Sequence, residues 1–94
     1  MTMYERISQR QATDVVIDCI VLKRREKAIL CDVSPTGCRI ELFDGTAQLG
    51  AMMVFQIDEA LQFAGEVVWV KKGQAGVRFT RPLSALIMDA LGLA

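Results

Sequence analysis

Two arginines near the N-terminus are of a type and spacing that could bind a phosphorylated ligand. Arg6 and Arg10 stand four positions apart in a segment with little apolar content. Each guanidinium group carries a planar fork of N–H donors that fits two phosphate oxygens or the O6 and N7 edge of guanine, and it can stack on a purine face. Two arginines at this spacing are frequent by chance, so a solvated terminus stays open as the structural alternative.

A second segment with ligand chemistry runs from Asp32 to Gly37. An aspartate at a strand end can accept hydrogen bonds from backbone N–H groups two residues on, Pro35 presets its own φ, and Gly37 can adopt a positive φ without steric cost. The segment therefore predicts a turn that exposes a carboxylate beside the hydroxyl of Ser34. These groups could accept from the N1 and N2 edge of a guanine and donate to a phosphate, respectively. A turn with a purely structural purpose is the alternative.

The composition excludes several other functions. The chain has 94 residues, 52% hydrophobic and 23% charged, which suits one folded domain rather than two domains or a disordered tail. Eleven basic and eleven acidic residues cancel, so no overall field attracts a nucleic acid or an anionic membrane. Histidine is absent from the sequence, and no nucleophile with a base, carboxylate pair or metal-ligand cluster stands out. We therefore expect no enzyme, no catalytic residue and no metal site.

The cysteines indicate an ordinary reduced protein. Cys19, Cys31 and Cys38 are an odd number, lie in apolar surroundings and form no C-x-x-C pair, so each is expected to be a small buried hydrophobe. The sequence shows neither a signal-peptide pattern nor an apolar run of about eighteen residues, which favours a cytoplasmic protein without membrane insertion.

Six short segments of alternating apolar and polar residues are expected to position the candidate ligand groups. These strands are predicted within residues 14–21, 28–33, 38–43, 50–57, 61–70 and 75–79. The polar run at 23–27 is predicted to be a solvated hairpin turn. In the fifth segment Phe63, Val67 and Trp69 are expected to face the core. Strands this short and evenly spaced predict an all-β fold, either an antiparallel barrel or a sandwich.

The two ends of the chain differ from this pattern. Residues 1–12 have no apolar periodicity and are expected to form a flexible arm, with the folded domain at 13–94. Apolar residues then recur at helical spacing, at Leu83, Leu86, Ile87, Ala90 and Leu91. They predict a short helix over about 81–91, with Thr80 as N-cap and Pro82 in the first turn. The apolar stripe is expected to plug the open end of the barrel or to meet a second copy of the chain. After Arg81 at its start the predicted helix has no Lys or Arg, which disfavours a membrane-surface role.

Taken together, the two ligand segments resemble the paired motif of PilZ domains. Arg6-x3-Arg10 followed 22 positions later by Asp32-x-Ser34-x2-Gly37 is similar to the R-x3-R and [D/N]-x-S-x2-G motifs of that family. Further similar segments are Gly50, Gly65-Glu-Val-Val-Trp69 and Gly76-Val77-Arg78-Phe79. The resemblance spans residues 6–87 and implies a six-stranded antiparallel β-barrel with a C-terminal helix.

The resemblance also implies a ligand, the bacterial second messenger cyclic di-GMP, with no further cofactor. Carried over by position, Arg6 and Arg10 would clamp phosphates and guanine edges. Asp32 and Ser34 would contact a guanine and its neighbouring phosphate, and Gly37 would hold the turn open. The implied function is a non-catalytic receptor or adaptor in second-messenger signalling, acting on an unidentified downstream protein.

Two other functions stay open at this point. A degenerate PilZ-like module that does not bind nucleotide would act through protein contacts alone, with the apolar helix stripe as its interface or as the contact of a homodimer. An oligonucleotide-binding small barrel has a suitable size and strand count. Only six aromatic residues and a net charge of zero argue against DNA or RNA binding.

Overall fold

The computed structural model of the chain describes residues 11–43 and 47–93. Within them it has six strands and one helix. In chain order these are β1 (Gln11–Val21), β2 (Arg24–Ser34), β3 (Gly37–Leu42), β4 (Met52–Gln56), β5 (Gln62–Lys71), β6 (Gln74–Phe79) and α2 (Ala85–Ala90). Most of the expected N-terminal arm, with Arg6 and Arg10, lies outside the described residues, whereas Gln11 and Ala12 belong to β1.

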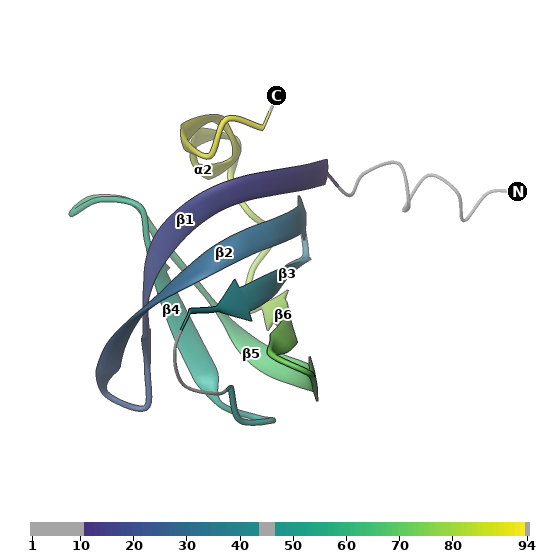
Figure 1. Cartoon of the computed structure of the whole chain (residues 1–94). Coiled ribbons are helices and arrows are strands. Elements are labelled where there is room, and N and C mark those ends of the chain that lie inside the picture. The colour runs from purple at the N-terminus through teal and green to yellow at the C-terminus, as the bar shows by residue number, and fades with distance from the viewer. Residues whose placement is uncertain (1–10, 44–46, 94) are drawn as a thin grey trace, which may run out of the picture.

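The strands form a closed antiparallel barrel in the order β1-β2-β3-β6-β5-β4 (Figure 1). β4 pairs back with β1, where Cys19 lies opposite Phe55 and Val21 opposite Met53. The predicted six-stranded barrel with a C-terminal helix is therefore confirmed. Closure gives each strand a partner on both sides over part of its length and encloses one apolar interior.

The barrel interior is filled by the inward-facing side chains that the alternating pattern predicts. Leu30, Ile40 and Phe55 are fully buried at its centre. Phe63 stacks on Phe55, with ring centroids 4.9 Å apart, and meets Phe79 edge-on at 5.3 Å. The aromatic contacts connect β4, β5 and β6, and Leu30 of β2 and Ile40 of β3 belong to the same core cluster. One continuous core therefore supports all the strands that carry the candidate site.

The connection between β1 and β2 is tighter than the sequence predicts. Leu22 and Lys23 form a two-residue turn with φ angles of 52° and 66°, and Arg24 already begins β2. The prediction of a turn over 23–27 is wrong because hairpins of this kind usually carry Asn or Gly at their two central positions, and neither is present here. Residues 24–27 pair with β1, whereas the register of β3 with β2 begins at Ala28.

The C-terminal helix begins later than predicted. Ser84 is the N-cap, and its hydroxyl accepts a hydrogen bond from the Ile87 N–H at 3.2 Å. Thr80 instead donates its N–H to the Ala64 carbonyl at 3.0 Å, and the Leu83 N–H binds the Pro35 carbonyl at 2.9 Å. These bonds to the barrel hold residues 80–83 outside the helix. Among the described residues no helix is long and apolar enough to cross a membrane.

The C-terminal segment packs against the core with only part of the predicted stripe. Leu91 is buried, and Leu83, Ile87 and Met88 pack against the core. Leu86, which was predicted to share that face, is 64% exposed. Successive residues of a helix lie about 100° apart, so Leu86 lies on the side of Ile87 away from Met88. A helix that contacts the core through Ile87 and Met88 therefore leaves Leu86 in solvent.

Candidate functional site

The turn between β2 and β3 is braced by its own serine. Pro35 and Thr36 form the tip, because β2 ends at Ser34 and β3 begins at Gly37. The Ser34 Oγ accepts hydrogen bonds from the N–H of Thr36 at 3.3 Å and of Gly37 at 3.2 Å, and it donates to the Gly37 carbonyl at 3.3 Å. A hydroxyl that satisfies backbone groups two and three residues on fixes the shape of a turn. Ser34 therefore has a structural role at this site.

Gly37 is needed for space rather than for an unusual φ. The glycines with a positive φ in the described part of the chain are Gly50, Gly73 and Gly92, so Gly37 does not use the positive φ that its residue type allows. A Cβ at position 37 would lie 2.6 Å from the Val77 carbonyl oxygen on β6. Glycine allows β3 and β6 to approach closely beneath the turn.

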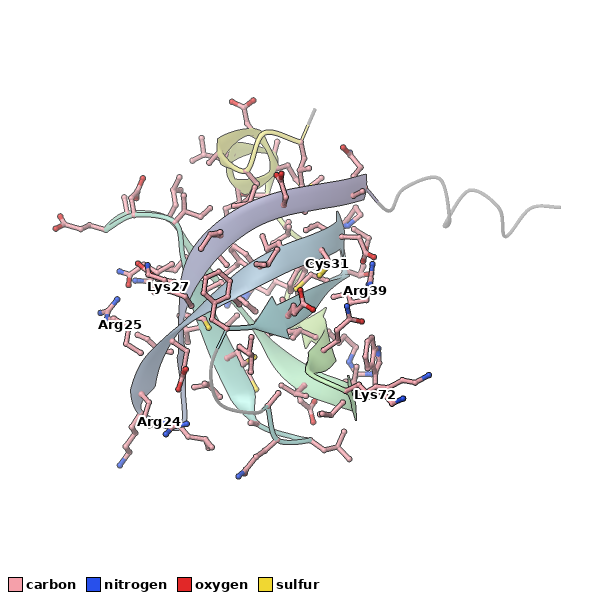
Figure 2. The ribbon with its side chains drawn as sticks, viewed as in Figure 1. Arg24, Arg25, Lys27, Cys31, Arg39 and Lys72 are labelled. Carbon is pink, nitrogen blue, oxygen red and sulfur yellow. The ribbon has the colours of Figure 1, made fainter. Side chains whose placement is uncertain are left out.

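The Asp32 carboxylate is held by a cross-strand arginine. Asp32 pairs with Arg39 of β3, whose Nε donates to Asp32 Oδ2 at 2.9 Å. The Arg39 Nη1 also donates to Gln74 Oε1 at 3.2 Å. The hydrogen bond and the charge of Asp32 raise the pKa of Arg39. Figure 2 shows Arg39 and Cys31 well separated from Arg24 and Arg25 of the β1–β2 hairpin.

Trp69 lies on the outside of the barrel next to this turn. The register of β5 with β6 shifts between Val67 and Trp69, and Trp69 is 40% exposed. Its expected position in the core is wrong because such a shift breaks the alternation of inward and outward side chains. The indole covers Gly76, where a Cβ would overlap the ring. Gly76 pairs opposite Trp69. This glycine is the feature of the sequence that could have indicated the arrangement.

A hollow of about 200 Å³ lies between the turn and the tryptophan. Ser34, Gly37, Trp69 and Arg78 contribute to its lining. Arg78 of β6 pairs opposite Gly37, and its Nη2 lies 3.5 Å from Glu66 Oε1 in an exposed ion pair. Exposed pairs of this length contribute little to stability. The hollow thus offers an aromatic face and a cation that the sequence analysis did not assign to the site.

The turn is also attached to the segment that leads to α2. The Phe79 N–H donates to the Thr36 carbonyl at 2.8 Å, and the Leu83 N–H to the Pro35 carbonyl at 2.9 Å. Of the two carbonyls of the turn tip, one therefore binds the last residue of β6 and the other a residue that follows β6. This arrangement connects the candidate site directly to residues 79–83.

The first strand starts beside the same turn. Gln11 pairs opposite Val33, and Ala12 opposite Asp32 (Figure 1). The β1 register shifts between Ala12 and Val15, where the Thr13 hydroxyl accepts a hydrogen bond from the Val15 N–H at 3.1 Å. The structure therefore brings Asp32, Ser34 and Gly37 together next to the start of β1. Arg6 and Arg10 lie outside the described residues.

The cysteines lie apart from any cluster of metal-ligand type. Cys19 and Cys38 are buried, and Cys31 is half-buried. Burial raises the pKa of the Cys19 thiol to about 11, so this thiol is protonated at neutral pH and is a poor nucleophile. No group of three or more His, Cys, Asp or Glu residues gathers in the part of the chain that the structure describes.

These features define a small closed barrel with a rigid polar turn and an aromatic hollow at one end. The family model of the PilZ domain matches residues 4–92, which include both motif segments. The chain belongs to the PilZ family, a family of cyclic di-GMP receptor domains. No curated protein matches the chain in sequence.

Proposed function

We propose that the chain is a non-catalytic cyclic di-GMP receptor or adaptor domain that binds its ligand at the β2–β3 turn. The proposed binding residues are Arg6, Arg10, Asp32, Ser34 and Gly37. The observation that carries this proposal is the pairing of Gln11 with Val33, because it starts β1 one residue away from Ser34 on the neighbouring strand. Arg10 directly precedes Gln11 in the sequence.

The distance along the chain also supports this assignment. Five residue steps separate Arg6 from Gln11, and extended chain covers at most about 3.6 Å per residue. Arg6 therefore lies within about 18 Å of the start of β1, and the length of its own side chain adds to that reach. Two arginines at this range can bind a ligand placed on the turn while the barrel keeps its shape.

The chemistry of the described groups suits a guanine nucleotide. A carboxylate has about four acceptor positions, so Asp32 can bind Arg39 and also accept from the N1 and N2 donors of a guanine. The exposed face of Trp69 offers a surface on which a purine can stack, a contact worth about 1–3 kcal/mol per base. Ser34 and Gly37 contribute by keeping the turn rigid and close to β6.

Titration with cyclic di-GMP tests this proposal. Trp69 is the single tryptophan of the chain, so its fluorescence reports directly on the hollow beside the turn. We expect a saturable change in emission with heat release in calorimetry, and affinity that falls as salt is added because charge-assisted phosphate contacts are screened. No heat and no fluorescence change at low salt would overturn the proposal.

A pair of arginine variants makes the test specific. Arg10→Ala should weaken binding at least tenfold, since it removes a bidentate phosphate or guanine contact. Arg25→Ala makes the same change of charge on the β1–β2 hairpin, where Arg25 donates to Gln56 at 3.3 Å, and should bind as the unaltered protein does. Equal losses in the two variants would indicate a nonspecific charge effect and contradict the assignment of Arg10.

The exposed Leu86 on α2 supports a second candidate function. An apolar side chain that is 64% exposed on a surface helix could contact a partner protein or a second copy of the chain. In that case the domain would act through protein contacts without nucleotide. Sedimentation of the protein and of Leu86→Asp distinguishes the candidates, because loss of a dimer in the variant, with no response to nucleotide, would favour the second.

A further inference from the structure

The Arg39 guanidinium group makes two side-chain hydrogen bonds at the candidate site. Arg39 pairs across the β2–β3 ladder with Asp32 and binds Oδ2 of that residue at 2.9 Å. On its other side it binds Gln74 at the start of β6, at 3.2 Å. The guanidinium group therefore bridges three strands, and its planar fork suits two contacts at once.

This ion pair is the most enclosed one among the described residues. The Arg39 side chain is 37% exposed and that of Asp32 14%. The cations of the other described pairs, Arg24, Lys27 and Arg78, are considerably more exposed. The low exposure of the pair and the hydrogen bond to Gln74 both restrict rotation of the Arg39 guanidinium group. The guanidinium group in turn restricts the orientation of the Asp32 carboxylate.

We propose that Arg39 is a positioning residue that orients the Asp32 carboxylate toward the guanine edge of the nucleotide and thereby sets base specificity. This inference rests on the proposed function. Guanine presents N–H donors at N1 and N2, whereas adenine has neither donor, so a carboxylate held in one orientation favours guanine. Arg39 acts through Asp32 and is separate from the arginines of the N-terminal segment.

The test compares cyclic di-GMP with cyclic di-AMP in matched variants. Arg39→Ala should weaken cyclic di-GMP binding about tenfold and leave cyclic di-AMP binding nearly unchanged, so the ratio of the two affinities falls. The salt dependence of cyclic di-GMP binding should stay the same because the phosphate contacts are intact. Lys27→Ala removes the cation of the Asp18 pair on the β1–β2 hairpin and should leave the ratio unchanged. An unaltered ratio in Arg39→Ala would overturn the inference.

Two further variants cover the case in which Arg39→Ala folds poorly. Arg39→Lys keeps the charge but replaces the fork by a single ammonium group, so it should lose part of the discrimination. Gln74→Ala leaves the ion pair between Arg39 and Asp32 but removes the hydrogen bond from Arg39 to Gln74. It should lower the ratio of cyclic di-GMP to cyclic di-AMP affinity by a smaller factor than Arg39→Ala does. Full discrimination in both variants would contradict the positioning role.

A double-mutant cycle distinguishes positioning from direct ligand contact. In an Asp32→Ala background, Arg39→Ala should have no further effect on affinity, because the group that it orients is gone. Equal effects of Arg39→Ala in both backgrounds would overturn the inference. Failure of the unaltered protein to bind cyclic di-GMP would instead refute the proposed function, so the two ideas fail on different results.

Discussion

Leu22 and Lys23 occupy left-handed backbone conformations that neither residue type adopts without cost. Their φ angles are 52° and 66°, where the Cβ of an L residue crowds its own carbonyl at a cost of about 1–2 kcal/mol. The β5–β6 hairpin has the same two-residue turn, with Lys72 at 46° and Gly73 at 82°. The second position of the two turns is thus a lysine in one and a glycine in the other.

Lys23→Gly should therefore stabilise the protein. We expect a gain of about 0.5–1 kcal/mol after the extra chain entropy of glycine is subtracted, which corresponds to a rise in Tm of a few degrees. Thermal unfolding followed by circular dichroism measures it. Gly73→Ala is the matched control at the equivalent position and should lower Tm. A Tm for Lys23→Gly at or below that of the unaltered protein would contradict the prediction.

Individual residues also show where sequence patterns stop being informative. Ser34 and Gly37 flank one turn as predicted, because the motif is local and its hydrogen bonds run between near neighbours. Asp32 instead lies within β2, where its carboxylate binds Arg39 across the β2–β3 ladder. The outward position of Trp69 depends on a register shift against β6, and the space beneath Gly37 depends on Val77. Such features arise from strand pairing, which alternation along one strand does not encode.

The helix α2 is attached to the barrel mainly through its C-terminal end. Leu91, the C-cap residue of α2, is 7% exposed, whereas Leu86 within the helix lies largely in solvent. Leu91→Ala should lower the free energy of unfolding by about 2–3 kcal/mol, because it removes buried apolar atoms and leaves a cavity. Leu86→Ala should change it by about 0.5 kcal/mol or less. Urea unfolding measures both, and similar losses in the two variants would contradict the described packing.

The elements themselves were predictable to different degrees. Six strands and their antiparallel arrangement follow from alternation and spacing, which each strand carries in its own residues. The start of α2 did not follow, although Thr80 and Pro82 are typical of a helix N-terminus. The N–H groups of Thr80 and Leu83 instead donate to the carbonyls of Ala64 and Pro35 in the barrel, which are distant in sequence. Tertiary hydrogen bonds outweighed the local signal there.

At the scale of the whole molecule, the site and the C-terminal segment share hydrogen bonds. The amides of Phe79 and Leu83 donate to the carbonyls of Thr36 and Pro35 at the tip of the turn. A ligand that rigidifies the turn should therefore slow exchange of these two amides. Exchange of the described residues far from the turn, such as Ile57, whose N–H binds the Leu61 carbonyl at 2.9 Å, should change little.

Hydrogen–deuterium exchange with and without cyclic di-GMP measures this effect. We expect protection of the Phe79 and Leu83 amides to increase several-fold at saturating ligand, as local opening of the turn becomes less frequent. Uniform protection over the whole barrel would indicate only general stabilisation. Binding without any change at these two amides would show that the turn and the C-terminal segment are not coupled.

The charged run on β2 has a consequence for self-association. Residues 24–26 pair with β1 on one side, while the bonds toward the β3 side begin at the Lys27 carbonyl, which accepts from the Phe43 N–H at 3.3 Å. Residues 24–26 therefore have a strand partner on one side only within the described residues. An open strand edge is a template on which another chain can add and start an aggregate. Arg24, Arg25 and Glu26 put charge on every position of that edge. The hairpin can therefore extend beyond the closed part of the barrel and still resist edge-to-edge aggregation.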